Sequence, residues 1–488
     1  MKQLTTILTN LSIIKTIGDA EGVLVGELIF DSRKAKKGDV FVAIKGTQTD
    51  GHSYIEQVTE IGVSVIVCEV LPEIQKENIV YVLVEDASIA LGVMASNYYD
   101  NPTKNLQLVG ITGTNGKTTT TSLLYELFTK LGYASVLVST IQIVVDGDII
   151  PTQNTTPDIV TLNRIFRQAV DKGCEYAFME VSSHGIVQNR IAGLYFRVAA
   201  FTNITHDHLD YHITFQNYIQ AKKKFFDELP ASTKALVNLD DRNGRVMLQN
   251  TVASKHFFTL KGDAEFKGKI LESRFDGMLL NFNQQEFWTN LIGQFNAYNL
   301  LLVYGIAHLL GQEDTEVLTI LSVLGSVEGR FQTFHTQGDR VIIVDYAHTP
   351  DALENVLDTI EGIRTKNEQL ITVVGCGGDR DKTKRPEMAD IAARKSDLAI
   401  FTSDNPRTEN PEAILADMEA GVEPQFYNKT LKITDRKEAI KTALKMSQKH
   451  DIILIAGKGH ETYQEINGVR NHFSDVEVAK ELSHQLNK

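Results

Sequence analysis

The sequence predicts an α/β protein of three domains, because its length exceeds one hydrophobic core and strand-like and helical patterns alternate along it. The chain has 488 residues, whereas single cores stop growing near about 250–300 residues. A glycine-rich turn between a strand and a helix predicts a central domain with a P-loop ATPase-like parallel sheet. Regular strand–helix alternation after Arg330 predicts a C-terminal Rossmann-like, doubly wound domain. The expected domains are residues 1–102, 103–332 and 333–488.

The composition is that of an ordinary globular protein with an acidic surface. Hydrophobic residues make up 42% and charged residues 23%, and the net charge is −13, which argues against a nucleic-acid partner. The three cysteines fit neither a disulfide framework nor a zinc knuckle, and reduced thiols suit the cytosol. The sequence has no apolar run of about 20 residues, and its start does not resemble a signal peptide. We therefore expect a soluble, cytoplasmic protein without membrane insertion.

The first expected domain has short strands between helical stretches. Strand-like apolar runs occur at Val40–Ile44 and Val63–Cys68, and Cys68 is expected to be buried. The segment Tyr98–Pro102 combines turn-forming residues with proline and predicts a linker.

The second expected domain begins with the apolar strand Leu106–Ile111 and the glycine-rich turn. A helix follows, because Leu123, Leu127 and Leu131 recur at four-residue spacing. Gly132 is expected to end that helix. Further strand-like runs lie at 178–181 and 198–203.

The third expected domain alternates most regularly and predicts a parallel, doubly wound sheet. Its expected strands are 341–345, 370–374, 398–402 and 452–456, and its expected helices are 350–363, 384–395 and 411–420.

Polar residues repeatedly follow the expected strands. Open α/β sheets bind ligands beyond the carboxyl ends of their strands, so this recurrence predicts two binding crevices in two domains. The segments concerned are Ser182–His184, His206–His208, Asp345, Asp379-Arg380, Asp404–Arg407 and Lys458–Glu461.

The turn Gly110–Thr119 has the composition of a phosphate-binding loop. Glycines let backbone N–H groups close around phosphate oxygens, and the following helix directs its positive end at the same place. Lys117 would add a cation for the β- and γ-phosphates of a nucleotide, and the Thr118 hydroxyl is placed for Mg²⁺. The usual pattern has glycine five residues before Gly116, where this chain has Ile111, so the loop is a variant. The alternative is a glycine-rich turn with an incidental Lys-Thr pair.

Several other polar segments could contribute to a site. Glu180, at a strand end, could hold Mg²⁺ through oxygen; the alternative is a surface or capping carboxylate. His206–His212 could be a zinc site, but its spacing is unusual for zinc, which favours one histidine assisting Mg²⁺. The default interpretation of Lys222–Lys224 is a solvated helix face, and that of Asn154–Pro157 is a turn.

Taken in order, these motifs resemble those of the Mur ligase family of peptidoglycan precursor synthesis, and the match spans nearly the whole chain. The matching segments are Asp31–Arg33, Gly110–Thr119, Glu180–Gly185, His206–His212, Tyr218–Lys222, Gly293–Asn299, Glu328–Phe331, Asp345–His348, Gly377–Lys382, Asp404–Arg407 and Gly457–Glu461.

The resemblance implies a ligase that uses ATP and Mg²⁺, and that forms an amide through an acyl phosphate between the central and C-terminal domains. Asp404–Arg407 resembles the signature of the branch that adds meso-diaminopimelate to the D-glutamate γ-carboxylate of UDP-N-acetylmuramoyl-L-alanyl-D-glutamate. Arg407 could bind the distal carboxylate of diaminopimelate bidentately and would repel the ammonium that ends lysine. The alternative for Arg407 is an exposed residue at a helix start. We expect the enzyme to be a monomer.

The resemblance also implies roles for individual residues. The catalytic set is Lys117, Glu180, His208, Arg330 and Lys222, the last as a carbamylated lysine. The Mg²⁺ ligands are Thr118, Glu180, His208 and Lys222. The ATP-binding set is Gly113, Thr114, Asn115, Gly116, Lys117, Thr118, Thr119, Asn296, Asn299, Arg330 and Asp345. The UDP-muropeptide set is Ser32, Asn154, Thr155, Thr156, Ser182, Gln188 and Arg190. The diaminopimelate set is Arg380, Asp404, Asn405, Pro406, Arg407, Gly457 and Glu461.

Three other functions compete with this interpretation. One is a lysine-adding enzyme of the same family. Another is a folylpolyglutamate synthase-like ligase, which should lack the Asp31–Arg33 region and Asp404–Arg407. A nucleotide-dependent switch is the third, and it would need no residues such as Glu180, Lys222 and Glu461 around a second pocket.

Overall fold

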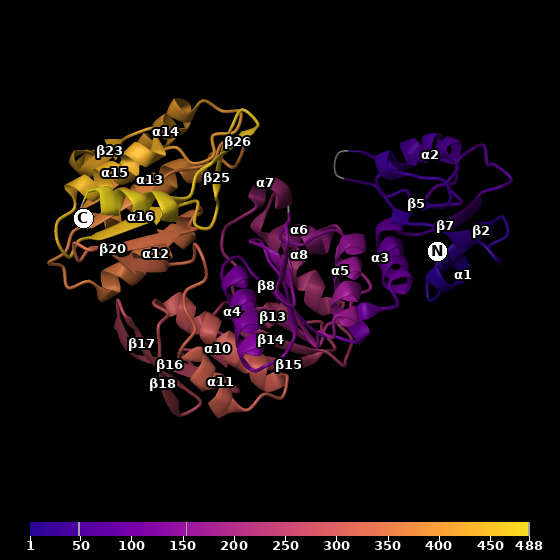
Figure 1. The fold of residues 1–488 in the computed structure, drawn as a ribbon, viewed down its shortest axis with the longest axis horizontal. Helices are drawn as coiled ribbons and strands as arrows, with labels where there is room; N and C mark the ends of the chain where they lie inside the picture. Colours follow the sequence, from indigo (N-terminus) through magenta and orange to yellow (C-terminus); the bar gives the residue numbers. More distant parts are fainter. Residues whose placement is uncertain (47–48, 153, 487–488) are drawn as a thin grey trace.

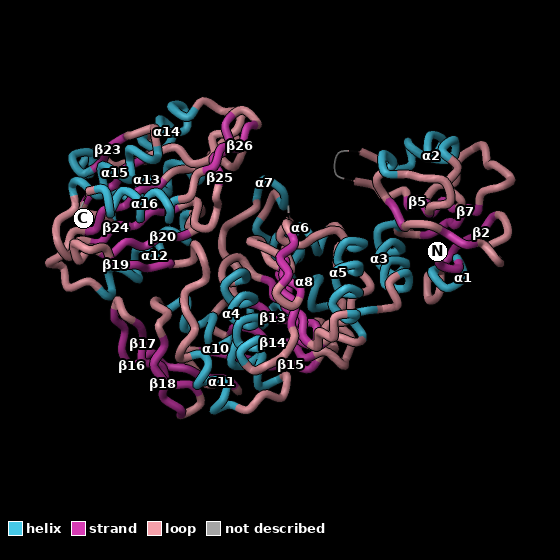
Figure 2. Tube along the Cα trace, in the orientation of Figure 1, coloured by secondary structure: helices cyan, strands magenta, loops and turns pink. Residues whose placement is uncertain are grey.

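The structure, a computed structural model, describes all residues except 47–48, 153 and 487–488. Three main sheets lie in three bodies that follow one another along the molecule (Figure 1). Helices cover the strands in each body (Figure 2), so the predicted α/β class is confirmed. The domain limits at residues 102 and 332 remain a proposal. The sheets support it, because each sheet takes all its strands from one expected domain, except that the last strand group begins one residue early, at Gln332. Within the described residues, no helix has both the length and the hydrophobicity needed to cross a bilayer.

The N-terminal body is a five-stranded sheet in the order β2-β7-β6-β5-β4. Its strands are β2 Ile13–Ile17, β4 Leu28–Ile29, β5 Val40–Val42, β6 Val65–Cys68 and β7 Val80–Val84, with a separate pair β1 Lys2–Gln3 and β3 Leu24–Val25. Its helices are α1 Leu4–Ile7, α2 Ile55–Ile61 and α3 Ala87–Tyr98. Cys68 is fully buried, as expected. Helix α3 joins this body to the central one, because a Cβ at Gly92 would lie 2.5 Å from the Ala192 carbonyl oxygen.

The central body is an eleven-stranded sheet whose middle is parallel. Its order is β11-β10-β9-β12-β8-β13-β14-β15-β16-β17-β18. Its strands are β8 Gln107–Thr112, β9 Ser135–Val138, β10 Ile143–Val145, β11 Asp148–Ile150, β12 Tyr176–Glu180, β13 Val198–Phe201, β14 Lys234–Asn238, β15 Ser254–Thr259, β16 Phe266–Arg274, β17 Gly277–Phe282 and β18 Gln285–Thr289. Antiparallel hairpins extend both ends of the sheet, and the sequence patterns did not predict them.

Helices pack on both faces of the central sheet. They are α4 Lys117–Lys130, α5 Ile159–Asp171, α6 Ser183–Val187, α7 Leu209–His212, α8 Phe215–Asp227, α9 Gly244–Met247, α10 Gln294–Leu309 and α11 Asp314–Leu321. Alternate side chains of the buried strands point to opposite faces, so α5 and α8 cover one apolar cluster and α4, α10 and α11 cover the other. Gly132 follows α4 at φ +92°, where glycine is favoured, and confirms the expected helix end.

The C-terminal body is a doubly wound sheet in the order β19-β20-β24-β21-β22-β23. Its strands are β19 Gln332–His335, β20 Val341–Asp345, β21 Leu370–Val374, β22 Leu398–Phe401, β23 Thr430–Lys432 and β24 Ile452–Ala456. Its helices are α12 Pro350–Ile363, α13 Lys384–Lys395, α14 Pro411–Glu419, α15 Arg436–Met446 and α16 Asp475–Gln485. The predicted parallel core is confirmed, whereas the antiparallel edge strand β19 and the hairpin β25 Tyr463–Ile466 and β26 Val469–His472 were not predicted.

A fully buried ion pair ties two helices of this body to its sheet. The Arg436 guanidinium donates to both carboxylate oxygens of Asp475 at 2.8 and 2.7 Å, and to the Ala456 carbonyl oxygen at 3.0 Å. An Asp475→Asn substitution would leave the buried Arg436 charge uncompensated. We expect it to lower the local stability by about 3–5 kcal/mol, measured by hydrogen exchange of the β24 amides in denaturant. Glu481→Gln on the same helix, which removes a half-exposed ion pair with Lys437, should cost less than about 1 kcal/mol.

Candidate active site

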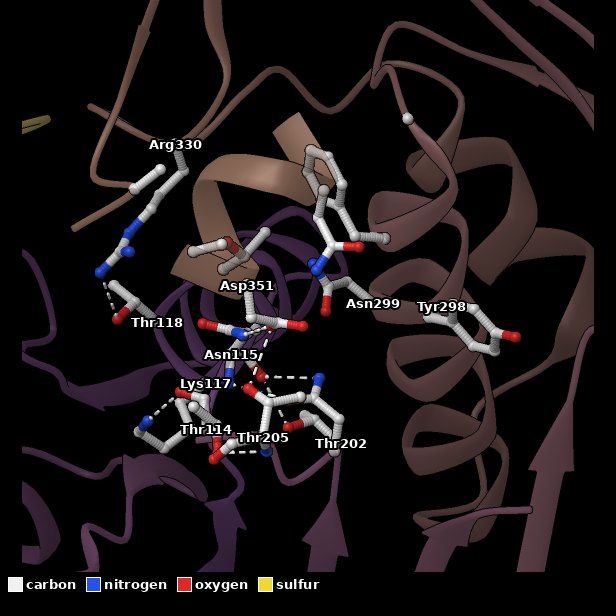
Figure 3. Close-up of a pocket in the computed structure, with 18 of the residues that line it drawn as sticks. Thr114, Asn115, Lys117, Thr118, Thr202, Thr205, Tyr298, Asn299, Arg330 and Asp351 are labelled. Atoms are coloured by element: carbon white, nitrogen blue, oxygen red, sulfur yellow. Dashed lines mark hydrogen bonds between the residues drawn. The ribbon is translucent and has the colours of Figure 1, made fainter. Parts of the chain in front are cut away.

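A cavity of about 950 Å³ lies between the central and C-terminal bodies. Its lining comes from the phosphate loop, the ends of β12 and β13, the start of α10, and the segment from Arg330 to α12. Figure 3 shows the loop residues Asn115 and Lys117 below Arg330, with Asn299 to one side. The carboxyl ends of parallel strands therefore supply the site, as expected for an open α/β sheet.

The predicted phosphate loop needs its glycines. Gly113 has φ +149°, and a Cβ there would clash with the Thr202 hydroxyl; Gly116 has φ +87°, and its Cβ would lie 2.5 Å from Asn299 Oδ1. Ile111, which replaces the usual first glycine, is a fully buried residue of β8. Helix α4 begins at Lys117, so the loop ends at a helix N-terminus, which favours anions.

Lys117 folds back over the loop. Its ammonium donates to the carbonyl oxygens of Gly113 at 3.0 Å and Thr114 at 2.8 Å. Burial lowers the pKa of Lys117, and the nearby carboxylates of Glu180 and Asp207 oppose this shift. This cation stands at the loop where phosphate oxygens would gain most from it.

Glu180 and Thr118 present oxygen atoms to the same cavity. The Glu180 carboxylate is fully buried and accepts from the Thr140 backbone N–H at 2.7 Å and the Thr140 hydroxyl at 3.2 Å. The alternative of a surface carboxylate is therefore wrong. Arg330 donates to the Thr118 hydroxyl at 3.1 Å and lies 4.5 Å from the ring centroid of Tyr346.

Lys222 and Lys223 are buried, so the solvated-face interpretation of this lysine run is wrong for both. Lys222 donates to the Gly113 carbonyl oxygen at 2.8 Å and lies 4.7 Å from the Tyr218 ring centroid. Burial and the neighbouring Lys117 hold the pKa of Lys222 well below its usual value. Lys223 pairs with Asp227 at 2.6 Å, and Lys224 is half-exposed.

His208 lines the cavity beside Lys222. Its Nε2 lies 3.5 Å from Asp207 Oδ2, and 42% of its side-chain surface is exposed. Partial desolvation by the cavity walls lowers the pKa of His208. Among the described residues, no group of three or more His, Cys, Asp or Glu side chains could together hold a metal ion. Hydroxyl and carboxylate oxygens with one imidazole fit Mg²⁺, which takes few protein ligands and completes its shell with phosphates and water.

The predicted nucleoside-side residues lie at different depths. Asn299 lines the cavity and donates to Asn296 Oδ1 at 3.2 Å, whereas Asn296 is buried behind it and donates to the Ile292 carbonyl oxygen at 2.8 Å. Asp345 also lines the cavity and accepts from the Phe331 N–H at 2.6 Å. Burial raises the pKa of Asp345 to about 6.

The predicted muropeptide residues are only partly assembled around this cavity. Thr155 and Ser182 line it. Arg190 donates to the Thr156 carbonyl oxygen at 2.7 Å and to Gln188 Oε1 at 2.6 Å, which links three predicted residues. None of these three is a lining residue of the cavity, and neither are the last two: Asn154 is exposed, and Ser32 is buried in the N-terminal body.

The predicted diaminopimelate residues form a separate cluster at the carboxyl ends of β22 and β24. Asn405 donates to Glu461 Oε2 at 2.8 Å. Gly457 has φ +117°, and a Cβ there would lie 2.7 Å from Asp404 Oδ2. Arg407 is half-buried and donates to the Gly378 carbonyl oxygen at 2.7 Å, so the alternative of an exposed residue is wrong. Pro406 is buried and Arg380 is exposed.

Sequence reasoning missed several residues at these sites. Asp351, at the start of α12, accepts from the Asn115 side-chain amide and the Thr205 hydroxyl, both at 3.0 Å, and so bridges the two bodies (Figure 3). Asp207 lines the cavity, and the fully buried Lys458 contacts Glu461. Asp207 and Lys458 belong to the polar segments that follow strands, which was the available signal. Asp351 looks like an ordinary acidic residue in a first helical turn.

Comparison with known families agrees with this geometry. Residues 26–99 match the Mur ligase family, catalytic domain; residues 111–307 match the Mur ligase middle domain; and residues 329–459 match the Mur ligase, glutamate ligase domain. A protein of Phocaeicola vulgatus named UDP-N-acetylmuramoyl-L-alanyl-D-glutamate--2,6-diaminopimelate ligase is 51% identical over 98% of this chain and 99% of its own length. The chain belongs to the Mur ligase family.

Other relatives of this Mur ligase carry the same name or share its fold. A Cytophaga hutchinsonii protein with that name is 50% identical over 100% of both chains. A solved structure with that name is 31% identical and covers 100% of this chain and 99% of its own, with a TM-score of 0.71. The MurF ligase of Thermotoga maritima, solved in complex with ADP, has a TM-score of 0.64 at 20% identity and covers 95% of this chain and 98% of its own, which shows the shared fold.

Proposed function

We propose that this Mur ligase adds meso-diaminopimelate to the γ-carboxylate of D-glutamate in UDP-N-acetylmuramoyl-L-alanyl-D-glutamate, with hydrolysis of ATP to ADP and phosphate. The observation that carries the proposal is that Lys117, Arg330 and Glu180 line one cavity at the glycine loop, while Asp404, Asn405 and Glu461 form a second polar cluster. The names of the relatives at 50–51% identity support the choice of substrates.

The chemistry requires two anions to meet, so positive charge is the main demand on the site. The loop N–H groups, Lys117 and Arg330 would hold the β- and γ-phosphates while the substrate γ-carboxylate attacks the γ-phosphorus and releases ADP. The product is an acyl phosphate. The amine of diaminopimelate then attacks the acyl carbon, and phosphate leaves. Mg²⁺, held by Thr118, Glu180, His208 and a carbamylated Lys222, would supply further positive charge when bound.

The two clusters account for the two remaining substrates. Thr155, Thr156, Ser182, Gln188 and Arg190 would hold the peptide and sugar close to the loop. Ser32 and Asn154 would contact the same substrate away from the cavity. Glu461, Asp404 and Asn405 would receive an ammonium of diaminopimelate, and Arg407 with Arg380 would bind a carboxylate. Asn299 and Asp345 would contact the nucleoside, with Asn296 supporting Asn299.

The test is a paired amino-acid assay. Purified protein with ATP and the UDP-muramoyl dipeptide should release phosphate when given meso-diaminopimelate, and far less when given lysine. Arg407→Ala should lower kcat/KM for diaminopimelate by about 10–100-fold, because a charge-assisted hydrogen-bond pair is lost. Arg394→Ala, at a half-exposed position on α13, is the matched control and should change nothing.

Two results of this assay would contradict the proposal. Phosphate release with lysine and not with diaminopimelate would show that Arg407 does not select the distal carboxylate. No phosphate release with either amino acid would show that the assigned reaction is wrong.

A further inference from the structure

Lys458 is a fully buried cation that the proposed reaction does not use. It follows β24, and its side chain has no exposed surface. Its ammonium donates to Glu461 Oε2 at 3.0 Å and to Asn405 Oδ1 at 3.2 Å, and it lies 4.0 Å from Asp404 Oδ1. Both hydrogen-bond acceptors thus belong to the proposed amino-acid site. Desolvating a buried ion pair can cost more free energy than the attraction between its charges returns, so stability alone does not explain why Lys458 is buried here.

We infer that Lys458 is a positioning residue of the amino-acid site, which bonds the Glu461 carboxylate and the Asn405 side chain and orients them to receive a substrate ammonium. The inference rests on the proposed function, because it takes Asp404–Glu461 to be the amino-acid site. Glu461 touches the substrate, whereas Lys458 acts through Glu461 and Asn405.

The electrostatic argument begins with two neighbouring carboxylates. Burial and Asp404 raise the pKa of Glu461, and Lys458 opposes that rise. A neighbouring negative charge favours the protonated form of Glu461, and a cation bonded to Glu461 opposes this effect. A protonated Glu461 would lose the charge that attracts an ammonium, so the substrate would bind less tightly.

Other charged and titratable groups face Glu461, and none replaces Lys458. Arg436, at the start of α15, interacts electrostatically with Glu461 over a longer range. Its guanidinium hydrogen-bonds Asp475 and the carbonyl oxygen of Ala456 instead. Tyr346, after β20, and Tyr463, on β25, are phenols whose pKa values are raised, mainly by burial, so they are neutral at pH 7. Among the side chains that the structure describes, Lys458 is therefore the cation bonded directly to this carboxylate.

The turn that carries Lys458 is shaped by its backbone. Gly457 and Gly459 have φ values of +117° and +52°. A Cβ added at Gly459 would lie 2.7 Å from the Cβ of Tyr346. The loop before Arg330 packs on the same turn, since a Cβ at Gly329 would clash with the His460 backbone. These glycines fix the turn independently of the Lys458 ammonium, so its removal is expected to change the charge of the site more than its shape.

The sign of the pH effect follows from this arrangement. Removing Lys458 raises the pKa of Glu461, so a smaller fraction of Glu461 is ionised at pH 7. Raising the pH restores the anion. The acid limb of kcat/KM for diaminopimelate should therefore move to higher pH in the variant, by about one unit for a tenfold change in ionisation.

The experiment compares K458M, K458Q and E461Q by steady-state phosphate release between pH 6 and 9. K458M should raise KM for diaminopimelate by about 10–100-fold at pH 7, leave KM for ATP within about twofold, and shift the acid limb upward. K458Q keeps a donor without the charge, so it should show the same limb shift with a smaller rise in KM. Lys441 is half-exposed on α15. The control Lys441→Met should change neither KM for diaminopimelate nor the position of the acid limb.

The outcomes separate this inference from the proposed function. If E461Q binds diaminopimelate as tightly as the wild type does, the amino-acid site is misplaced. The site assignment in the proposed function and the inference about Lys458 then both fail. If E461Q raises KM while K458M and K458Q leave KM and the acid limb unchanged, only the inference about Lys458 is wrong. An equal rise in KM for ATP and diaminopimelate would indicate a general structural role and would also overturn it. If K458M does not fold, K458Q decides the question: an upward shift in the acid limb of its kcat/KM supports the inference, and an unshifted limb contradicts it.

Discussion

Lys117→Ala is expected to lower kcat for phosphate release by about 10³-fold. Removing a single fixed donor from a transition state typically costs about 10²–10³ in rate, and here the donor is also a buried charge at the loop where two anions must meet. The Lys117 ammonium already bonds the carbonyl oxygens of Gly113 and Thr114, so it is held in place before substrates bind. The measurement is coupled phosphate release with saturating dipeptide and diaminopimelate.

The control for this substitution lies on the same helix. Lys130→Ala, at the exposed end of α4, removes a cation of the same kind away from the cavity and should leave kcat unchanged. Thermal unfolding should show that both variants are folded. Wild-type product formation by Lys117→Ala, or a nucleotide bound elsewhere in the molecule, would refute the assignment of the phosphate loop.

The parallel cores of the central and C-terminal bodies could be predicted from sequence because burial on both faces leaves continuous apolar runs. Strand Val341–Asp345 and helix Pro350–Ile363 have the bounds that the pattern predicts. The hairpin β17–β18 was not predicted in this way. Met278, Leu280 and Phe282 of β17 are fully buried at alternate positions, but β18 is mostly half-exposed and combines polar with apolar residues, so the second strand of the pair lacks a clear period. Edge strand β19 is also half-exposed and was missed for the same reason.

The candidate site shows a similar division. A local motif predicted the loop, because a strand, a glycine turn and a helix place their chemistry within one short segment. The role of Glu180 was predicted through the resemblance to the Mur ligase family. Asp351 was missed because its significance arises from the approach of two bodies, which brings it to Asn115 and Thr205 across long stretches of chain. Sequence spacing does not encode such a contact. The burial of Lys222 and Lys223 likewise depends on what α8 packs against.

Lys222→Ala is expected to lower kcat by about 10³-fold, through a different cause from Lys117→Ala. The ammonium groups of Lys117 and Lys222 both donate to the Gly113 carbonyl oxygen, at 3.0 and 2.8 Å. Two cations this close in a buried site repel each other strongly. A neutral amine at Lys222 removes the repulsion. Addition of CO₂ to that amine forms an N–C bond and releases one proton to solvent, which gives an anionic carbamate that attracts Lys117. A carbamate also supplies the oxygen ligands that Mg²⁺ prefers.

The carbamate can be tested independently of the rate. Wild-type protein equilibrated with ¹³C-bicarbonate should show one slow-exchanging carbamate signal in the ¹³C spectrum, and Lys222→Ala should lack it. Lys224→Ala, half-exposed on the same helix and bonded to Asn189, should keep both the signal and the rate. Depleting CO₂ should lower wild-type activity, and bicarbonate should restore it, because the modification is reversible. If Lys222→Ala is inactive and the wild type shows no carbamate signal, the unmodified lysine itself is required. If Lys222→Ala is fully active, the positive charge at this loop comes from Lys117 and Arg330 alone.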